Sequence, residues 1–189
     1  MRYNVFMPTD FVIPSRVSHV TKALENGGFE AYLIGGCTRD LIMGIEPKDW
    51  DITTNATPEQ IQSLFEKTVY ENEFGTVAVI FEDEPSDSTV RSIEVTPYRT
   101  EEKYSNNRHP DAVSFSDHLE DDLERRDFTM NTIAISVGQS IKDIDENNKR
   151  HSVNIKDIYK GQVAIEKKEI IAVGNAKDRF EEDALRILR

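Results

Sequence analysis

Two aspartates, Asp49 and Asp51, lie two residues apart at the start of a short apolar segment, with Trp50 between them. Residues i and i+2 of a β-strand project from the same face, so this spacing points both carboxylates into one cleft and Trp50 toward the core. Carboxylate oxygens are ligands that Mg²⁺ accepts together with substrate phosphates. The pair therefore indicates a metal site for phosphate chemistry, although an isolated pattern of this kind is more often two exposed acids.

A glycine turn shortly before this pair offers a place to bind phosphate. Gly35 and Gly36 end an apolar segment and open a helix that contains Arg39. Glycines permit close backbone approach, a helix N-terminus presents N–H groups to an anion, and arginine adds a forked donor. Each feature alone is weak, since Arg39 could simply pair with Asp40. The turn and the acidic pair together indicate nucleotidyl transfer.

The segment 125–131 brings two adjacent arginines close to an aspartate and an asparagine. Arg126 suits bidentate phosphate contacts, while Asp127 and Asn131 suit ribose hydroxyls or the bracing of a loop. A local salt bridge with the acidic stretch 117–124 is an equally simple interpretation, and the spacing does not exclude it.

Two further groups could take part in the same chemistry. Glu94 is a third candidate carboxylate, on a strand that could lie beside the acidic pair or could face solvent. Asp183 and Arg186 are three residues apart and would share one helical face. Such an acceptor and donor match the amino group and ring nitrogen common to cytosine and adenine, while an intrahelical salt bridge is the alternative.

Hydrophobic periodicity predicts the elements that must position these residues. Helices are expected over 14–26, 38–43, 57–65 and 117–125, and strands over 29–34, 50–53, 75–81 and 89–98, the last two as a hairpin. A second hairpin is expected from 133–137 and 141–144 around Gly138 and Gln139, and one continuous helix over 175–189. The polar segment 100–111 is expected to be a long mobile loop.

The composition predicts a folded, soluble, cytoplasmic protein of one domain, or of one domain plus a stub. Its residues are 38% hydrophobic and 31% charged. The sequence has neither the uninterrupted apolar run of about 18 residues that a membrane span needs nor the pattern of a secretory signal. Its single cysteine, Cys37, has no disulfide partner within the chain. The formal net charge of −12 repels nucleic acid at long range, so phosphate binding must depend on local basic clusters or divalent metals.

Four segments resemble, in order, the signature motifs of bacterial class II tRNA nucleotidyltransferases and their poly(A) polymerase relatives. They are LIGGCTRDLIMGIEPKDWDITT at 33–54, RHP at 108–110, RRDFTMN at 125–131 and EDALRILR at 182–189. The resemblance implies an α+β fold, a polymerase-β-like nucleotidyltransferase head whose mixed sheet is flanked by helices. The head would occupy 1–145, and 146–189 would form its end and the first helix of a helical neck.

The resemblance also implies roles for particular residues. Asp49 and Asp51 would be the catalytic ligands of two Mg²⁺ ions, and Asp183, Arg186 and Arg189 would line a base-reading helix. The expected nucleotide-binding residues come from the glycine turn, the segment 125–131 and the base-reading helix. They are Gly35, Gly36, Arg39, Arg126, Asp127, Asn131, Asp183, Arg186 and Arg189.

The activity implied is the template-independent addition of C and A residues, from CTP and ATP, to the 3′ end of tRNA. The loop at 100–111 would help the specificity change from C to A. Tight tRNA binding is expected to need residues beyond Arg189, where the family has its neck, body and tail. A poly(A) polymerase, a partial enzyme adding only C or only A, and a nucleotide-binding module without turnover remain as alternatives.

Overall fold

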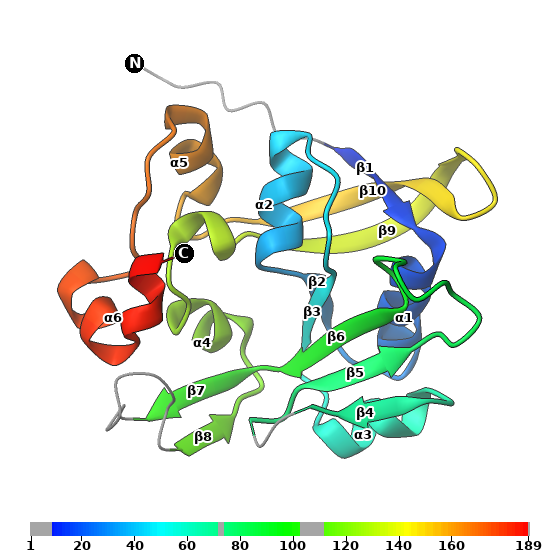
Figure 1. Cartoon of the computed structure of the whole chain (residues 1–189), viewed down its shortest axis with the longest axis horizontal. Coiled ribbons are helices and arrows are strands. Elements are labelled where there is room, and N and C mark those ends of the chain that lie inside the picture. Colours follow the sequence, from blue (N-terminus) through cyan, green and yellow to red (C-terminus); the bar gives the residue numbers. More distant parts are fainter. Residues whose placement is uncertain (1–8, 72–73, 103–111, 189) are drawn as a thin grey trace.

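An eight-stranded mixed sheet organises the computed structural model, which describes residues 9–71, 74–102 and 112–188 (Figure 1). Its strand order is β1-β10-β9-β2-β3-β6-β5-β4, and β7 and β8 form a separate two-stranded ribbon. Among the described strands, β3 and β6 pair in parallel and the other pairs are antiparallel. The strands are β1 Asp10–Pro14, β2 Ala31–Leu33, β3 Asp51–Thr54, β4 Thr68–Tyr70, β5 Val77–Ile80, β6 Ser92–Pro97, β7 Arg99–Glu102, β8 Ala112–Phe115, β9 Ala134–Asp143 and β10 Asn148–Lys156.

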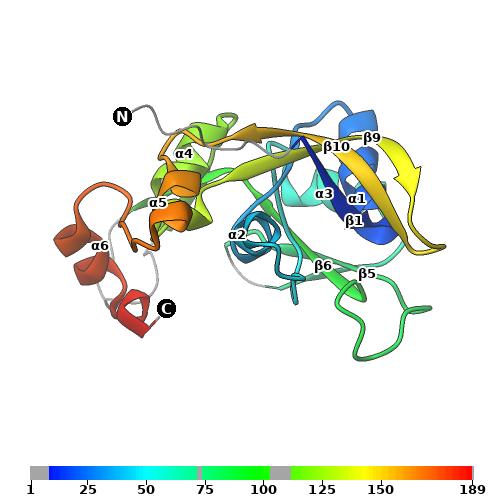
Figure 2. The same ribbon diagram turned by 90° about the horizontal axis from the view of Figure 1, so that it is seen from above.

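Helices cover both faces of this sheet. They are α1 Ser15–Asn26, α2 Gly36–Met43, α3 Pro58–Leu64, α4 Leu119–Glu124, α5 Gly161–Lys167 and α6 Ala176–Glu182, with the 3₁₀ turns η1 Thr129–Asn131 and η2 Ala184–Leu188. Helices α1 and α3 lie beside each other (Figure 2) and share the main core, to which β2 contributes Leu33. Tyr32 and Ile34 point the other way, into a smaller core with Leu119 and Leu123 of α4. The mixed sheet flanked by helices confirms the predicted fold class.

Side-chain alternation in two strands determines which face carries the predicted acids. Ile52 of β3 and Ile93 and Val95 of β6 are buried in the main core with α1 and α3. Because successive strand residues point to opposite faces, Asp51 and Glu94 project on the α4 side of the sheet. The acids therefore lie on the face of the sheet that packs against α4, opposite the face covered by α1 and α3.

Several predicted elements are confirmed within one or two residues. The helix at 57–65 is α3, and Thr57 and Gln60 form the reciprocal hydrogen bonds of a capping box. The hairpin of β5 and β6 is also present. The first part of the loop predicted at 100–111 is wrong, because residues up to Glu102 belong to β7. The rest of that prediction, residues 103–111, lies outside the described part of the chain.

The hairpin predicted around Gly138 and Gln139 is wrong. Strand β9 runs unbroken from Ala134 to Asp143, and the chain reverses only before β10. A β-carbon at Gly138 would lie 2.5 Å from Ser152 Oγ and 3.0 Å from its carbonyl oxygen. Glycine is needed here because two strands approach closely near a register shift at His151, which a turn-based interpretation cannot detect.

The continuous helix predicted over 175–189 is also wrong. Helix α6 ends at Glu182, Asp183 adopts an extended conformation (φ −136°, ψ 105°), and the 3₁₀ turn η2 follows. The Asp183 carboxylate accepts a hydrogen bond from the Leu185 backbone N–H at 2.9 Å. Such local side-chain bonding offers the backbone an alternative to the helix. Asp183 and Arg186 therefore do not share a face of one α-helix.

The predicted boundary near residue 145 falls in the turn between β9 and β10. Strand β10 pairs with both β1 and β9, so the sheet includes residues up to Lys156. In the described part of the chain, no helix is long and apolar enough to cross a membrane.

Candidate active site

Two of the candidate carboxylates lie side by side on β3 and β6, and the third precedes β3. Asp51 is the first residue of β3, and the parallel register places Glu94 of β6 directly beside it. Asp49 is exposed in the loop before β3, while Trp50 between the two aspartates is buried, 2% exposed, as its spacing predicted. The long-range pairing of β3 with β6 thus brings the third candidate acid to the predicted pair.

The carboxylates in this cluster oppose one another's ionisation. Glu94 is only partly buried, and this burial is the largest cause that raises its pKa to about 7. The charges of Asp51, Glu71 and Asp49 raise the pKa further. Burial likewise raises the pKa of Asp51, where Arg126 opposes the rise and Asp49 and Glu71 increase it. Glu71 was missed by the sequence analysis. Its position follows from the chain's reversal between β4 and β5, where its N–H bonds the Thr76 carbonyl oxygen.

The chemistry of these donors fits a hard divalent cation. Carboxylate oxygens suit Mg²⁺, and a bound cation would relieve the repulsion that raises the pKa values of Asp51 and Glu94. Among the described residues, no group of three or more acidic, histidine or cysteine side chains is already arranged as a metal site. The acids can therefore supply part of a coordination shell, and substrate phosphates and water would complete it.

The glycine turn lies between the acids and an arginine. Gly35 has φ 81° and ψ −134°, a conformation that side chains with a β-carbon disfavour. A β-carbon there would lie 3.2 Å from Asp51 Oδ2 and 3.7 Å from Arg126 Nη1. Helix α2 begins at the next residue, Gly36, so its first N–H groups belong to this turn. The structure thus brings Asp51, the turn and Arg126 to one point.

A second group of predicted residues is linked by hydrogen bonds. Arg39 Nη1 donates to Asn131 Oδ1 at 3.3 Å, and Asn131 Nδ2 donates to Asp127 Oδ1 at 3.1 Å. The same Asp127 oxygen accepts from the Phe128 N–H at 2.7 Å. The alternative pairing of Arg39 with Asp40 is also present, at 2.7 Å. This network orients three predicted nucleotide contacts from segments distant in the sequence.

Asp122 of α4 is a residue that the sequence analysis did not single out. It is completely buried and forms ion pairs with both Arg125 and Arg126. The salt bridge between the arginines and the acidic stretch, left open above, is therefore present. The spacings i, i+3 and i, i+4 along the sequence are the signal that could have identified Asp122 as the partner.

The predicted base-reading residues lie in a separate, buried position. Asp183 and Arg186 are 7% and 5% exposed. Arg186 Nη1 donates to Glu182 Oε2 at 2.6 Å, and its Nη2 donates to the Arg125 carbonyl oxygen at 3.2 Å. The first bond attaches η2 to α6, and the second attaches it to the residue that caps α4. Arg189 and the motif at 108–110 lie outside the described residues.

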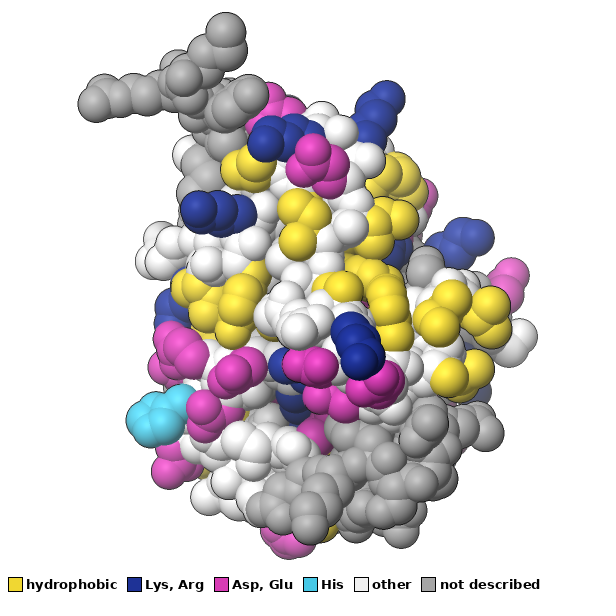
Figure 3. Space-filling model, turned by 90° about the vertical axis from the view of Figure 1, so that its left-hand side faces the viewer, with side chains coloured by type: hydrophobic (Ala, Val, Ile, Leu, Met, Phe, Trp, Pro, Cys, Tyr) yellow, Lys and Arg dark blue, Asp and Glu magenta, His cyan; other side chains and the backbone are white. Residues whose placement is uncertain are grey.

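Acidic side chains form a band across the face shown in Figure 3, with hydrophobic side chains above it.

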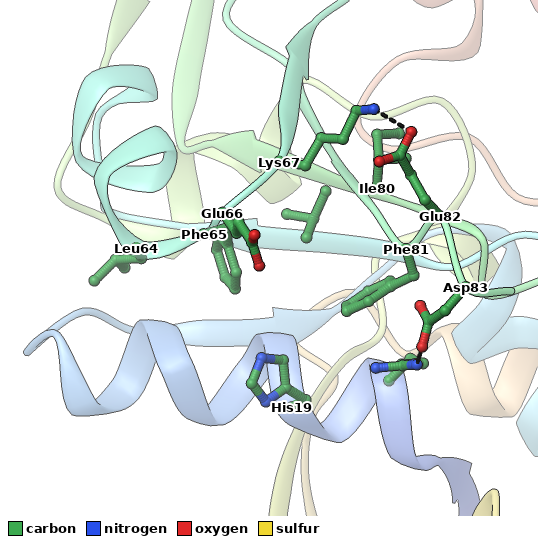
Figure 4. Close-up of a pocket in the computed structure, with 11 residues that line it drawn as sticks. His19, Leu64, Phe65, Glu66, Lys67, Ile80, Phe81, Glu82 and Asp83 are labelled. Carbon is green, nitrogen blue, oxygen red and sulfur yellow. Dashed lines mark hydrogen bonds and ion pairs between the residues drawn. The ribbon is translucent and has the colours of Figure 1, made fainter.

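A cavity away from the predicted site lies between α1 and the β4–β5 edge (Figure 4). Its volume is about 580 Å³, and none of the predicted site residues lines it. Among its charged groups, Lys67 pairs with Glu82 and Arg16 with Asp83.

Comparisons with known proteins agree with this geometry. The family described as "Poly A polymerase head domain" matches residues 31–171. CCA-adding enzymes of Staphylococcus haemolyticus and Bacillus cereus are each 43% identical to the chain, over 90% and 92% of its length. The chain covers 38% and 39% of those relatives, so it spans about two fifths of their length.

Solved structures show the same fold. The Bacillus stearothermophilus CCA-adding enzyme in complex with CTP matches with a TM-score of 0.71 and 34% identity, over 94% of this chain and 38% of that chain. The Thermotoga maritima CCA-adding enzyme complexed with tRNA shares the fold with a TM-score of 0.61 and 20% identity, over 92% of this chain and 35% of that chain.

Proposed function

Since the chain belongs to the Poly A polymerase head domain family, we propose that it is the nucleotidyltransferase head of an enzyme that adds C and A residues to the 3′ end of tRNA. The substrates would be CTP, ATP and a tRNA end. The relatives that are 43% identical are CCA-adding enzymes, and a 34% identical one has been solved with CTP. The observation that carries the proposal is that Asp51 and Arg126 flank the Gly35 turn, with Glu94 beside Asp51 on the neighbouring strand.

Asp49 and Asp51 would hold the metal, with Glu94 as a neighbouring oxygen donor. Two bound Mg²⁺ ions would neutralise triphosphate charge and lower the pKa of the attacking 3′-hydroxyl. The protein's own part is to keep these carboxylates together despite their repulsion, which the parallel register of β3 and β6 does.

The turn and its neighbours would bind the nucleotide. Backbone N–H groups from Gly36 onward and the Arg126 guanidinium would contact phosphate oxygens, because both are donors beside the acidic cluster. Arg39, Asn131 and Asp127 would contact the sugar side, since their mutual hydrogen bonds already limit their conformations.

We further propose that Asp183, Arg186 and Arg189 select the base, and that residues 146–189 end the head and begin a helical neck. For Arg186 to meet a base edge, its guanidinium must exchange the bond to Glu182 for one to the nucleotide. Replacement of Asp183 or Arg186 by Ala should relax discrimination against GTP and UTP, whereas Lys177→Ala, 78% exposed in its side chain on α6, should not. Unchanged selectivity for CTP and ATP in both variants would refute this role.

An extension assay tests the function as a whole. The full gene product is incubated with Mg²⁺, a tRNA that lacks its terminal CCA, and CTP, ATP or both, and the products are sized. Extension by C and then A supports the proposal. Long A tails would instead indicate a poly(A) polymerase, and the addition of only C or only A would indicate a partial enzyme. Metal-dependent binding without extension would indicate a nucleotide-binding module that lacks turnover.

A further inference from the structure

Asp122 is a buried carboxylate that holds two arginines at once. Its side chain is 0% exposed, and burial of an ionised carboxylate is costly unless partners satisfy its oxygens. Oδ1 accepts from Nε and Nη2 of Arg125, at 2.9 and 2.5 Å. Oδ2 accepts from Nε and Nη2 of Arg126, at 3.2 and 2.8 Å, and from Thr53 Oγ1 at 3.2 Å. Both carboxylate oxygens of Asp122 therefore accept hydrogen bonds, from Thr53 of β3 and from the two arginines that follow α4.

In both arginines, Nε and Nη2 bond to Asp122. The Nη1 amino group of each arginine therefore points away from Asp122. Arg125 Nη1 donates to Glu101 Oε1 of β7 at 2.9 Å. Arg126 Nη1 extends toward the Gly35 turn, 3.7 Å from the position of a β-carbon there. Asp122 thus determines which atom of Arg126 faces the turn.

The neighbouring Asp51 makes this orientation important. Its Oδ2 lies 3.2 Å from the same β-carbon position that Arg126 Nη1 approaches to 3.7 Å, so the two side chains flank the Gly35 turn. A guanidinium group free to rotate would offer two parallel N–H groups to the Asp51 carboxylate, which is the geometry of a strong bidentate ion pair. Such a pair would occupy oxygens that the proposed metal site needs.

We propose that Asp122 is a positioning residue, which keeps Arg126 off the Asp51 carboxylate and presents its Nη1 to the nucleotide. The inference rests on the proposed function, because the nucleotide contact of Arg126 belongs to it. Asp122 itself would act only through Arg126. The Arg125 contact with β7 extends the same cluster toward the strand that precedes residues 103–111.

The orientation can be measured in the unaltered full chain without turnover. Protein labelled with ¹⁵N-arginine is examined by NMR, the Arg126 Nε–H signal is assigned with the Arg126→Lys variant, and its exchange with solvent is followed. We expect exchange at least about tenfold slower than for a solvated arginine, because the Nε–H is bonded to a buried carboxylate. Exchange at the solvated rate would overturn the proposal.

A double-mutant cycle separates positioning from a purely structural role. We expect Asp122→Asn to raise the KM for CTP and ATP about ten- to a hundredfold, with the KM for tRNA changed less than about twofold. In an Arg126→Ala background, the same change should have less than about a twofold effect, because the residue that it positions is gone. Glu120→Gln, an exposed acid on the same helix, should leave every parameter unchanged.

Multiplicative effects of the two substitutions, or equal losses toward CTP and tRNA, would overturn the positioning role. If Asp122→Asn does not fold, the exchange measurement on the unaltered chain decides alone. If the unaltered protein neither extends tRNA nor binds CTP, the proposed function fails, and slow Arg126 Nε–H exchange would still show that Asp122 fixes the arginine.

Discussion

Asp51 combines burial with three acidic neighbours, an arrangement that costs stability in the absence of a cation. Burial raises its pKa, and the charges of Asp49 and Glu71 raise it further, while Arg126 acts in the opposite direction. Carboxylates kept in such an unfavourable position often serve a function. Here the function would be to hold a divalent cation beside the phosphate-binding turn.

Asp51→Asn should therefore separate activity from stability. We expect incorporation of CMP and AMP into tRNA to fall about a thousandfold or more, since a metal ion contributes several kcal/mol to phosphoryl transfer. The melting temperature should not fall, because the substitution removes a repelling charge. Thermal unfolding and single-nucleotide incorporation measure the two effects, with the exposed Asp87→Asn as control. Activity within tenfold of the unaltered protein would contradict the metal role.

Asp122 provides a pH-dependent prediction at the same scale. Burial tends to raise its pKa, but the guanidinium groups of Arg126 and Arg125 outweigh burial and hold the pKa below its ordinary value. Its ionised form therefore stabilises the fold at pH values above about 4, the unfolded-state pKa. This contribution is lost as the pH falls through the lower, folded-state pKa.

We expect Asp122→Asn to lower the free energy of unfolding by about 2 kcal/mol at pH 7, the usual size for hydrogen bonds to a charged group. The difference from the unaltered chain should shrink as the pH falls from about 4 through the lower folded-state pKa, because Asp122 is protonated in both states only below that folded-state pKa. Urea unfolding at a series of pH values measures this, with Glu120→Gln as control. A difference that stays constant down to pH 2 would refute the ionised pair.

At the element scale, the packing of α5 against η1 depends on one glycine. A β-carbon at Gly161 would lie 2.2 Å from the Thr129 carbonyl oxygen and 2.8 Å from Ile133 Cγ1. Backbone at that distance must move to admit even a methyl group. Because η1 contains Asn131, which bonds both Arg39 and Asp127, this packing also supports the proposed nucleotide contacts.

Gly161→Ala should accordingly destabilise the chain by roughly 1–3 kcal/mol, as overpacking does in closed cores. A matched control is Gly36→Ala, where a new β-carbon would lie 3.7 Å from Arg39 Nη2, an ordinary contact. We expect no loss of stability from Gly36→Ala, since Ala favours helices more than Gly does. Equal free energies of unfolding for the two variants, measured in urea, would show that the α5–η1 contact is not close.

At the scale of the whole molecule, a net charge of −12 opposes RNA binding. Most protein affinity for nucleic acid comes from cationic side chains that release counterions from phosphates. The acidic band across the face in Figure 3 offers little of this, so the proposed grip on tRNA would need further basic surface.

We predict that residues 1–189 alone bind tRNA with a Kd no tighter than about 10⁻⁶ M at physiological salt, the range of non-specific contacts. Fluorescence anisotropy at several salt concentrations measures this, and the full gene product serves as the comparison. CTP binding by residues 1–189 in Mg²⁺ should persist, because all of its proposed contacts lie within that range of the sequence. Nanomolar tRNA binding by these residues would contradict the prediction.

Local patterns predicted what local chemistry controls. The helix that begins after Thr57, the glycine turn before α2 and the buried Trp50 between two acids each depend on a few neighbouring residues. The predictions failed where a distant contact, or a side chain bonding to its own backbone, outweighs the pattern. Gly138 resembles a turn residue but serves the close approach of Ser152, and Asp183 interrupts a helix whose apolar stripe continues.

The sequence by itself determined the residue types and spacings of the site, the class of fold and the chemistry that these favour. Only the tertiary structure decided that Glu94 lies beside Asp51, that Arg126 reaches the Gly35 turn, and that Glu71 joins the acidic cluster. The reason is physical. Backbone preferences and hydrophobic period act over a few residues, whereas strand pairing and burial bring together side chains whose separation along the chain carries no signal of their contact.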